Sequence, residues 1–242
     1  MDVKALLIVG LFSVLVAVFA YETHEHRTRA TGMDSIVSLY QGPQQAWPEP
    51  HLSDGIPHRP LAPLPDPSYP EDNPYTEAKE QLGKRLFFDP RLSASGTIAC
   101  ASCHDPDLGW SDGRSRSFGH ARREGKRNSM TILNVAFYDH LFWDGRAESL
   151  EEQSLAAIRS RSEMNMGLDR LAERIGAVDG YLPLFAKSFG DAQVTAERIA
   201  KALATYERGI TSRTSDFDRF LQGDRDAMTD RQIYGMHLFR TK

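Results

Sequence analysis

Cysteine is nearly absent from this 242-residue chain: it has two, Cys100 and Cys103, and both lie in the segment Cys-Ala-Ser-Cys-His. This excludes a disulfide framework beyond that one pair and a zinc site built on two cysteine pairs. A large excess of one charge is also lacking, since the formal net charge is −4, so there is no electrostatic case for binding nucleic acid. Strand-like alternation is scarce, with Met130 to Val135 as the best candidate. We therefore expect a mainly α-helical protein with long loops.

The N-terminus carries a long hydrophobic run. Ala5 to Tyr21 is interrupted only by Gly10 and Ser13, and Val18-Phe19-Ala20 offers the small residues that favour cleavage after Ala20. The run is marginal in length for a membrane-spanning helix and slightly long for a signal-peptide core. We therefore predict export, with residues 1–21 as a signal peptide or an N-terminal anchor. Contact with a membrane is expected only through this segment.

Proline is concentrated in one stretch. Ten of the 13 prolines fall between Pro43 and Pro74. Because proline fixes φ and removes a backbone donor, Gln41 to Tyr75 is interpreted as an extended segment without a helix, within a linker or surface strap of residues 22–75.

Helical periodicity dominates the rest of the chain. Thr76 to Phe88 has apolar residues at helical spacing, and further helices are predicted from apolar stripes and N-terminal capping residues. These are a helix capped by Ser149 with Glu152, a stripe from Leu168 to Ile175, a helix capped by Thr195, and one begun by Thr229 with Gln232.

The segment Cys100-Ala101-Ser102-Cys103-His104 predicts one covalently bound c-type haem. Two thiols one helical turn apart can add to the haem vinyl groups, and the next histidine can bind the iron. A thioredoxin-like redox site would need a βαβ surround, which this helical pattern does not offer. Attachment of haem c on the exported side agrees with the N-terminal segment.

Further blocks follow in a fixed order along the chain: Gly83-Lys84-Arg85-Leu86-Phe87-Phe88-Asp89, Ser102-Cys103-His104, Arg127-Asn128-Ser129, Phe142-Trp143-Asp144-Gly145-Arg146 and Glu163-Met164-Asn165. Together they resemble the bacterial di-haem cytochrome c peroxidases and the related enzymes that mature methylamine dehydrogenase. The resemblance implies two cytochrome-c-like helical domains, each with one haem. It also implies reduction of hydrogen peroxide to water in the periplasm, with electrons from a small c-type cytochrome or a cupredoxin, and it allows a homodimer.

The resemblance also implies roles for individual residues. Cys100, Cys103 and His104 match the attachment site of the peroxide-reacting haem, and His120 matches the distal histidine that occupies the sixth iron position in the oxidised resting state. Four further matches belong to the surroundings of this haem. Glu163 matches the distal acid that moves protons, Gln153 the distal amide, Trp143 the aromatic between the two haems, and Asn128 a ligand of a calcium ion between the domains.

The chain departs from the family pattern in two ways. Ala121 and Met130 stand where glycine and proline are common around the distal loop. A second haem motif is also missing, although Leu82-Gly83-Lys84-Arg85-Leu86-Phe87 recurs in outline as Tyr234-Gly235-Met236-His237-Leu238-Phe239. The expected domains are therefore residues 76–228, an N-terminal haem c domain, and residues 229–242, the first helix of a second haem domain that is cut off.

Three functions are compatible with these residues. The preferred one is the N-terminal portion of a di-haem cytochrome c peroxidase. The alternatives are a mono-haem electron-transfer cytochrome and a related di-haem enzyme that oxidises a protein or an organic substrate. A truncated sequence is the expected reason for the missing haem, and a genuine one-haem protein is the alternative.

Overall fold

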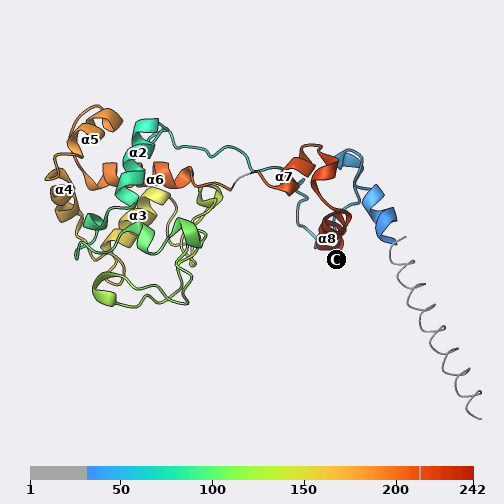
Figure 1. Ribbon diagram of the computed structural model, residues 1–242, viewed down its shortest axis with the longest axis horizontal. Helices are drawn as coiled ribbons and strands as arrows, with labels where there is room; N and C mark the ends of the chain where they lie inside the picture. The colour runs from blue at the N-terminus through green and yellow to red at the C-terminus, as the bar shows by residue number, and fades with distance from the viewer. Residues whose placement is uncertain (1–31, 213) are drawn as a thin grey trace, which may run out of the picture. The chain divides into compact units, whose positions relative to one another are not determined.

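The computed structural model describes residues 32–212 and 214–242 (Figure 1). The expected signal peptide or anchor at residues 1–21 lies outside them. Among the described residues, no helix is both long enough and apolar enough to cross a bilayer. The chain divides into two compact units: unit 2 runs from Asp66 to Arg213, and unit 1 combines the segments on either side of it.

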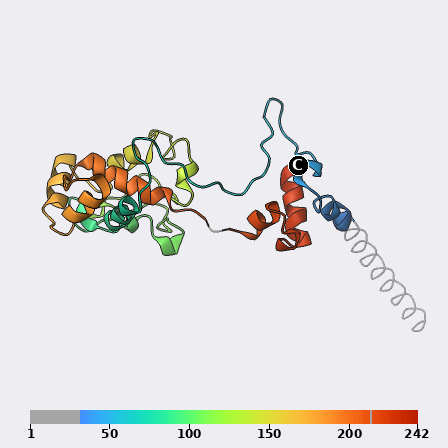
Figure 2. The same ribbon diagram turned by 90° about the horizontal axis from the view of Figure 1, so that it is seen from above.

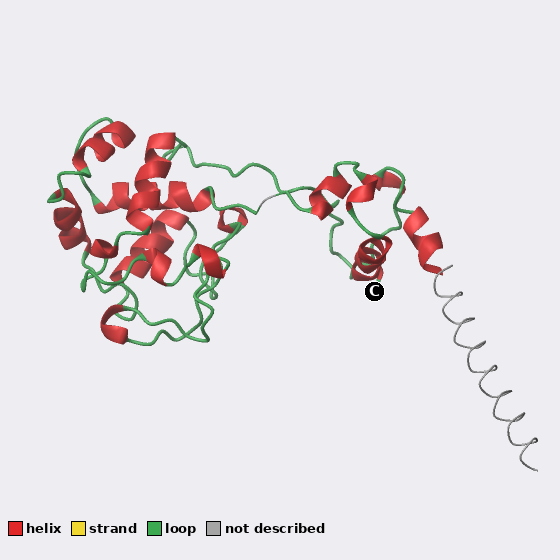
Figure 3. Cartoon of the chain, viewed as in Figure 1, coloured by secondary structure: helices red, strands yellow, loops and turns green. Residues whose placement is uncertain are grey.

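Helices form both units, and the described residues contain isolated β-bridges but no strand (Figure 3). The best strand candidate in the sequence, Met130 to Val135, does not form a strand. Ile132 and Val135 instead contribute to a small apolar cluster, and the amide of Ile132 donates to a single carbonyl, that of Trp110. Without a neighbouring extended segment, the alternating apolar residues there cannot build a ladder.

Unit 2 is built around one long helix, α6 (Ala196–Arg208), which crosses its centre (Figures 1 and 2). The helices around it are α2 (Glu77–Phe87), α3 (Leu150–Arg159), α4 (Leu168–Gly176) and α5 (Leu182–Phe189). Short 3-10 turns occupy the loops: Pro90–Leu92, Cys100–Ser102, Pro106–Leu108, His120–Arg122 and Val135–Phe137. The mainly helical fold with long loops is confirmed.

The predicted capping residues begin their helices. Thr195 accepts a hydrogen bond from the amide of Arg198, and Thr229 forms a reciprocal capping box with Gln232. Ser149 caps α3, but the carboxylate of Glu152 accepts from the amide of Glu148, so the predicted box is only half formed. Helix α5 was not predicted, because its eight residues carry apolar side chains on most sides and no capping side chain.

Helices α2 and α6 cross at Gly83. A Cβ at this position would collide with the backbone carbonyl of Ala202, so only glycine permits the approach. Phe87 follows one turn later, fully buried, and packs edge-to-face on Tyr206 of α6. This crossing orders the chain just before the Cys-Ala-Ser-Cys-His segment.

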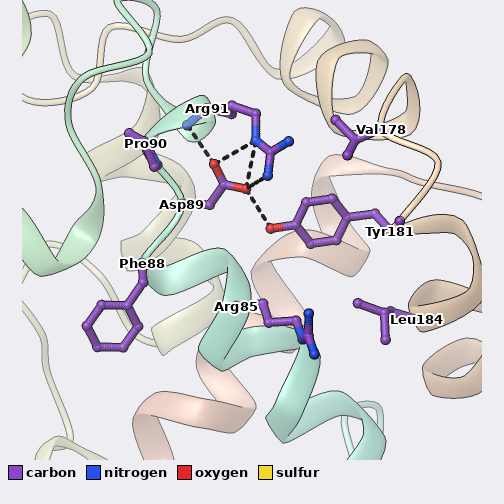
Figure 4. A pocket seen from close by; sticks show the side chains of 9 residues that line it. Arg85, Phe88, Asp89, Pro90, Arg91, Val178, Tyr181 and Leu184 are labelled. Carbon is purple, nitrogen blue, oxygen red and sulfur yellow. Dashed lines mark hydrogen bonds and ion pairs between the residues drawn. The ribbon is translucent and has the colours of Figure 1, made fainter.

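A hydrogen-bonded group fastens the end of α2 to the start of α5 (Figure 4). The Asp89 carboxylate accepts from the guanidinium of Arg91 at 2.9 Å and from the Tyr181 hydroxyl at 2.7 Å. Burial alone would raise the pKa of Asp89, but these hydrogen bonds outweigh burial and lower it. The three side chains line a hollow of about 390 Å³ together with Arg85 and Leu184.

Residues 66–75, expected as part of the linker, are anchored on unit 2. Asn73 is completely buried, and its amide donates to the Glu151 carboxylate at 2.7 Å and to the Lys201 carbonyl at 3.0 Å. Lys79 donates to the Asn73 side-chain oxygen, and Arg208 holds Glu151 by an ion pair of 2.7 Å. A buried polar group so fully paired keeps this segment in one place.

Unit 1 corrects the expected boundaries. Residues 32–38 are helical, and the 3-10 turn Gln44–Ala46 follows in the stretch where no helix was expected. Residues 214–228, which were expected in the haem domain, form α7 (Asp216–Leu221) and the 3-10 turn Arg225–Ala227 within unit 1. Helix α8 (Asp230–Thr241) completes the unit.

Aromatic contacts explain why these segments belong together. Buried Trp47 packs on Phe220 at 5.6 Å and on Tyr40 at 5.1 Å between ring centroids. The guanidinium of Arg225 lies over the Trp47 ring and donates to the Gly42 carbonyl at 2.9 Å. Proline content predicted an extended strap, but Tyr40 and Trp47 supply enough apolar surface to fold part of it.

Candidate haem site

The site begins at the Cys-Ala-Ser-Cys-His segment, which forms a tight 3-10 turn. The amides of Cys103 and His104 both donate to the carbonyl of Cys100, at 3.1 and 3.0 Å, and Ser102 caps the amide of Ala99. Both thiols are free, and burial raises the pKa of each. The turn therefore presents two neutral thiols and a histidine from one backbone loop.

The imidazole of His104 is held in one tautomer. Its Nδ1 lies 3.1 Å from the carbonyl oxygen of Trp110, and because a carbonyl can only accept, Nδ1 carries the proton. Burial lowers the pKa of His104, which keeps the ring neutral. The lone pair is thus on Nε2, the atom that would bind a metal, and the Ser129 hydroxyl lies 3.5 Å from it.

The backbone of Trp110 adopts a left-handed conformation with φ of 63°, which is rare for a bulky residue. Its side chain packs against Phe87 and Tyr206 at ring-centroid distances of 6.0 and 6.4 Å. This packing fixes the carbonyl that orients His104. Sequence analysis did not find this contribution, since a backbone carbonyl leaves no signal in residue identity.

The loop with His120 lies against the segment with Glu163. The amide of His120 donates to the carbonyl of Glu163 at 2.6 Å, and the bridge between Phe118 and Glu124 closes the loop. Gly119 makes this contact possible, because a Cβ there would collide with the carbonyls of Ser162 and Glu163. The structure therefore brings two predicted site residues together, although they are 43 positions apart in the sequence.

We expect Gly119→Ala to separate the two segments. The added methyl group would displace the backbone of Ser162 and Glu163, at a cost of about 1–3 kcal/mol, the usual range for overpacking a close contact. Urea unfolding measures the loss of stability, and Gly180→Ala, at an open position whose φ, like that of Gly119, is not positive, measures what a methyl group does without any clash. Equal stability of the Gly119→Ala and wild-type proteins would contradict the close contact.

The groups of this loop fit a haem pocket. Among the described residues, His120 Nδ1 and Ser117 Oγ are two of the few buried side-chain atoms that lack a hydrogen-bond partner. Such orphaned groups are rare unless something else satisfies them. Burial raises the pKa of Glu163, although the charge of Arg146 opposes this. A histidine with a spare nitrogen beside a protonatable acid matches the donor set that the sequence predicts.

The three further predicted site residues are Gln153, Trp143 and Asn128. Gln153 lies half-buried on α3, and its amide makes no side-chain hydrogen bond within the described part of the chain. Trp143 is 75% exposed at a turn where Arg127 and Arg146 both pair with Asp144.

Asn128 is exposed, and no group of three His, Cys, Asp or Glu side chains within residues 32–212 and 214–242 could hold a metal ion. The roles of Gln153, Trp143 and Asn128 stay predictions.

Comparison with known proteins identifies one family. The model of a family described as di-haem cytochrome c peroxidase matches residues 77–226. The chain is 40% identical to the methylamine utilization protein MauG of Methylophilus methylotrophus over 86% of this chain and 61% of that protein. It is 39% identical to the cytochrome c551 peroxidase of Nitrosomonas europaea over 66% of this chain and 48% of that protein.

Solved structures give the same result. A MauG-like protein associated with microbial copper homeostasis superposes with a TM-score of 0.62 and 31% identity, over 72% of this chain and 51% of that one. The diheme peroxidase BthA of Burkholderia thailandensis gives a TM-score of 0.58 and 27% identity, over 69% and 47%. The chain therefore spans roughly half the length of most of the relatives it matches.

Proposed function

Because this chain belongs to the family of di-haem cytochrome c peroxidases, we propose that unit 2 is the peroxide-reacting half of an enzyme that reduces hydrogen peroxide to water. The observation that carries this proposal is the hydrogen bond from the His120 amide to the Glu163 carbonyl. It holds the backbones of a histidine and of a half-buried glutamate together in the unit that contains the two cysteines and His104.

Each residue has a distinct task in this proposal. Cys100 and Cys103 would hold haem c through thioether bonds to its vinyl groups, and His104 would bind its iron through Nε2. When bound, haem c would supply the redox centre that delivers two electrons to peroxide. The Glu163 carboxylate accepts a proton from one peroxide oxygen and returns it to the other as the O–O bond breaks, and two further protons complete two waters. Gln153 orients the peroxide by a hydrogen bond.

His120 is proposed as a second residue that would hold the haem iron in the resting state. Its ring nitrogen Nδ1 is buried and without a partner among the described residues, and Ala121 and Arg122 beside it have φ of 54° and 57°. Left-handed conformations at two consecutive non-glycine residues store strain in the loop. Movement of His120 would allow this strain to relax and would open the pocket to peroxide.

We expect His120→Gly to change the spin state of the oxidised haem. Two histidine ligands give a low-spin iron, and loss of one leaves a high-spin or water-bound iron. Absorption and electron paramagnetic resonance spectra of the oxidised protein measure this, with His140→Gly, at an exposed position, as the control. A low-spin spectrum that survives His120→Gly would place the sixth ligand elsewhere.

A second haem is proposed to lie in a part of the protein beyond Lys242. Helix α8 repeats the pattern of α2 but not its packing: Phe87 is fully buried, whereas the corresponding Phe239 is 90% exposed. Gly83 lies in contact with α6, whereas a Cβ added at Gly235 would meet no atom within 4 Å. Helix α8 thus leaves exposed the residues that correspond to those with which α2 packs against its own domain.

The surrounding assignments follow from the same family membership. We propose export to the periplasm through residues 1–21, electron supply by a small c-type cytochrome or a cupredoxin, and a calcium ion at Asn128. Similarity to MauG supports a second candidate, oxidation of a protein by the same site. A mono-haem carrier is less well supported. Such a carrier normally has methionine as its sixth iron ligand, whereas Met164 and Met166 lie buried in the apolar core of unit 2.

Peroxide-dependent oxidation of a reduced small c-type cytochrome tests the proposed function. Two haem-loaded proteins are compared, the chain of residues 1–242 and a form that continues to a second Cys-x-x-Cys-His motif. We expect sustained turnover from the longer form and little from the shorter one, which has a single haem. No turnover in either protein would contradict the proposal, and full turnover by the shorter chain would contradict the need for a second haem.

A further inference from the structure

We infer that the segment 114–127, here called the basic loop, is together with Arg161 a docking surface for an acidic protein partner. The basic loop contains six of the chain's 29 basic residues but one of its 33 acidic residues, so it carries a charge of +5 in a chain of net charge −4. Hydrogen peroxide is uncharged and gains nothing from such a field. A haem bound beside His120 would bring two propionate carboxylates, so the proposed chemistry accounts for at most two of these five excess positive charges.

Most of these charges are exposed and not neutralised. Arg116 approaches Glu124 at 3.7 Å, with both side chains more than half exposed, and Arg127 pairs with Asp144. The other basic residues of the loop, Arg114, Arg122, Arg123 and Lys126, are exposed and form no ion pair within the described part of the chain. Repulsion among them is unfavourable until an anionic surface approaches.

Hydrogen bonds hold these charges on an ordered backbone. The amide of Gly119 donates to the carbonyl of Arg123 at 2.9 Å, and the amide of Gly125 donates to the carbonyl of Ser117 at 2.8 Å. The guanidinium of Arg123 donates to the carbonyl of Arg161 at 3.0 Å, which brings a further arginine next to the loop. A preorganised backbone loses less entropy when a partner binds, so less of the interaction energy is spent on ordering.

The side-chain types indicate a protein rather than another polyanion. Five of the six basic residues in the loop are arginines, and Phe118 between them is 40% exposed. The guanidinium of Arg114 lies over the Phe118 ring at 5.6 Å. Arginine and aromatic residues are enriched at protein interfaces, and lysine is depleted there.

The remainder of the chain favours one orientation of such a partner. Outside the basic loop the formal charge is −9, which follows from a net charge of −4 and a loop charge of +5. An acidic protein is therefore repelled by most of the chain and attracted at the loop. Complementary charge of this kind raises the association rate and fixes the docking face.

Binding of labelled 20-residue peptides to the haem-loaded protein tests the inference. The probe is an acidic peptide of glutamate with leucine at every fourth position, measured by fluorescence anisotropy at low and moderate salt. Arg114→Glu/Lys126→Glu is compared with Arg170→Glu/Lys187→Glu, which makes the same charge change at exposed residues of α4 and α5. Unchanged haem spectra establish that both variants are folded.

We expect the wild-type protein to bind the peptide, the loop variant to bind about 10-fold or more weakly, and the control variant to lose less than about 3-fold. Phe118→Ala should weaken binding by about 3-fold without changing its salt dependence. Equal losses in both charge variants, or absence of binding by wild type, would overturn the inference. Tighter binding to a 20-base-pair DNA duplex or to phosphatidylserine vesicles than to the peptide would also overturn it.

Discussion

Glu163→Gln is expected to lower kcat/KM for peroxide by about 10²–10⁴-fold in the two-haem protein, the range for loss of a general acid–base group. Glutamine keeps the size of the side chain, so the close contact between Gly119 and the backbone of Glu163 remains. Only the titratable group is removed. Because the lost interaction belongs to the transition state, kcat and kcat/KM should fall together.

Two controls separate this loss from a structural effect. Gln153→Ala removes an orienting hydrogen bond and should cost less than Glu163→Gln, while Glu173→Gln at an exposed position of α4 should leave the rate unchanged. The wild-type rate should also fall as the pH drops through the pKa of Glu163, which burial raises, because the carboxylate form must accept the first proton. A Glu163→Gln rate equal to wild type would assign proton transfer to another group or to water.

Cys100→Ala/Cys103→Ala is expected to abolish covalent haem attachment. Both sulfurs come from one tight turn, in which the carbonyl of Cys100 accepts hydrogen bonds from the amides of Cys103 and His104. Alanine keeps this backbone turn, so His104 should stay oriented by Trp110 while both thioether bonds are lost. Haem staining after acid–acetone extraction and denaturing electrophoresis measures the loss.

Each single cysteine variant should retain haem through one thioether, at a lower yield. Ser102→Ala serves as the control inside the same turn: it removes the cap of the Ala99 amide but leaves both sulfurs. Haem that resists extraction in the double variant would show that attachment does not depend on these thiols.

Much of unit 2 could be predicted from the sequence, because its strongest signals are local. A capping threonine and an apolar stripe at helical spacing define α6 within 13 residues. The crossing of α2 and α6 was not predicted, although Gly83 lies at the crossing point. A glycine inside a helix indicates a close approach but does not identify the residue that approaches. Met130 to Val135 shows the opposite case: its alternating pattern made it the best strand candidate, but it has no partner strand in the structure.

The candidate site was predictable in its residues but not in its contacts. The spacing of the motifs indicated His120 and Glu163, but the hydrogen bond that joins their segments uses backbone groups. The contribution of Trp110 is likewise a carbonyl and a backbone conformation. Ala121, noted in the sequence because glycine is common there, has a positive φ in the structure, and this explains why glycine suits the position.

The division of the chain constrains the order in which the protein can fold. Unit 2 is continuous from Asp66 to Arg213 and can close its core as soon as this segment is available. Trp47 of unit 1, by contrast, packs on Phe220, which lies 173 residues later in the sequence. Tyr40 and Trp47 therefore stay unburied until the chain has passed through the whole of unit 2 to Phe220. Exposed aromatic side chains favour aggregation, so unit 1 is the part of the chain expected to fold last.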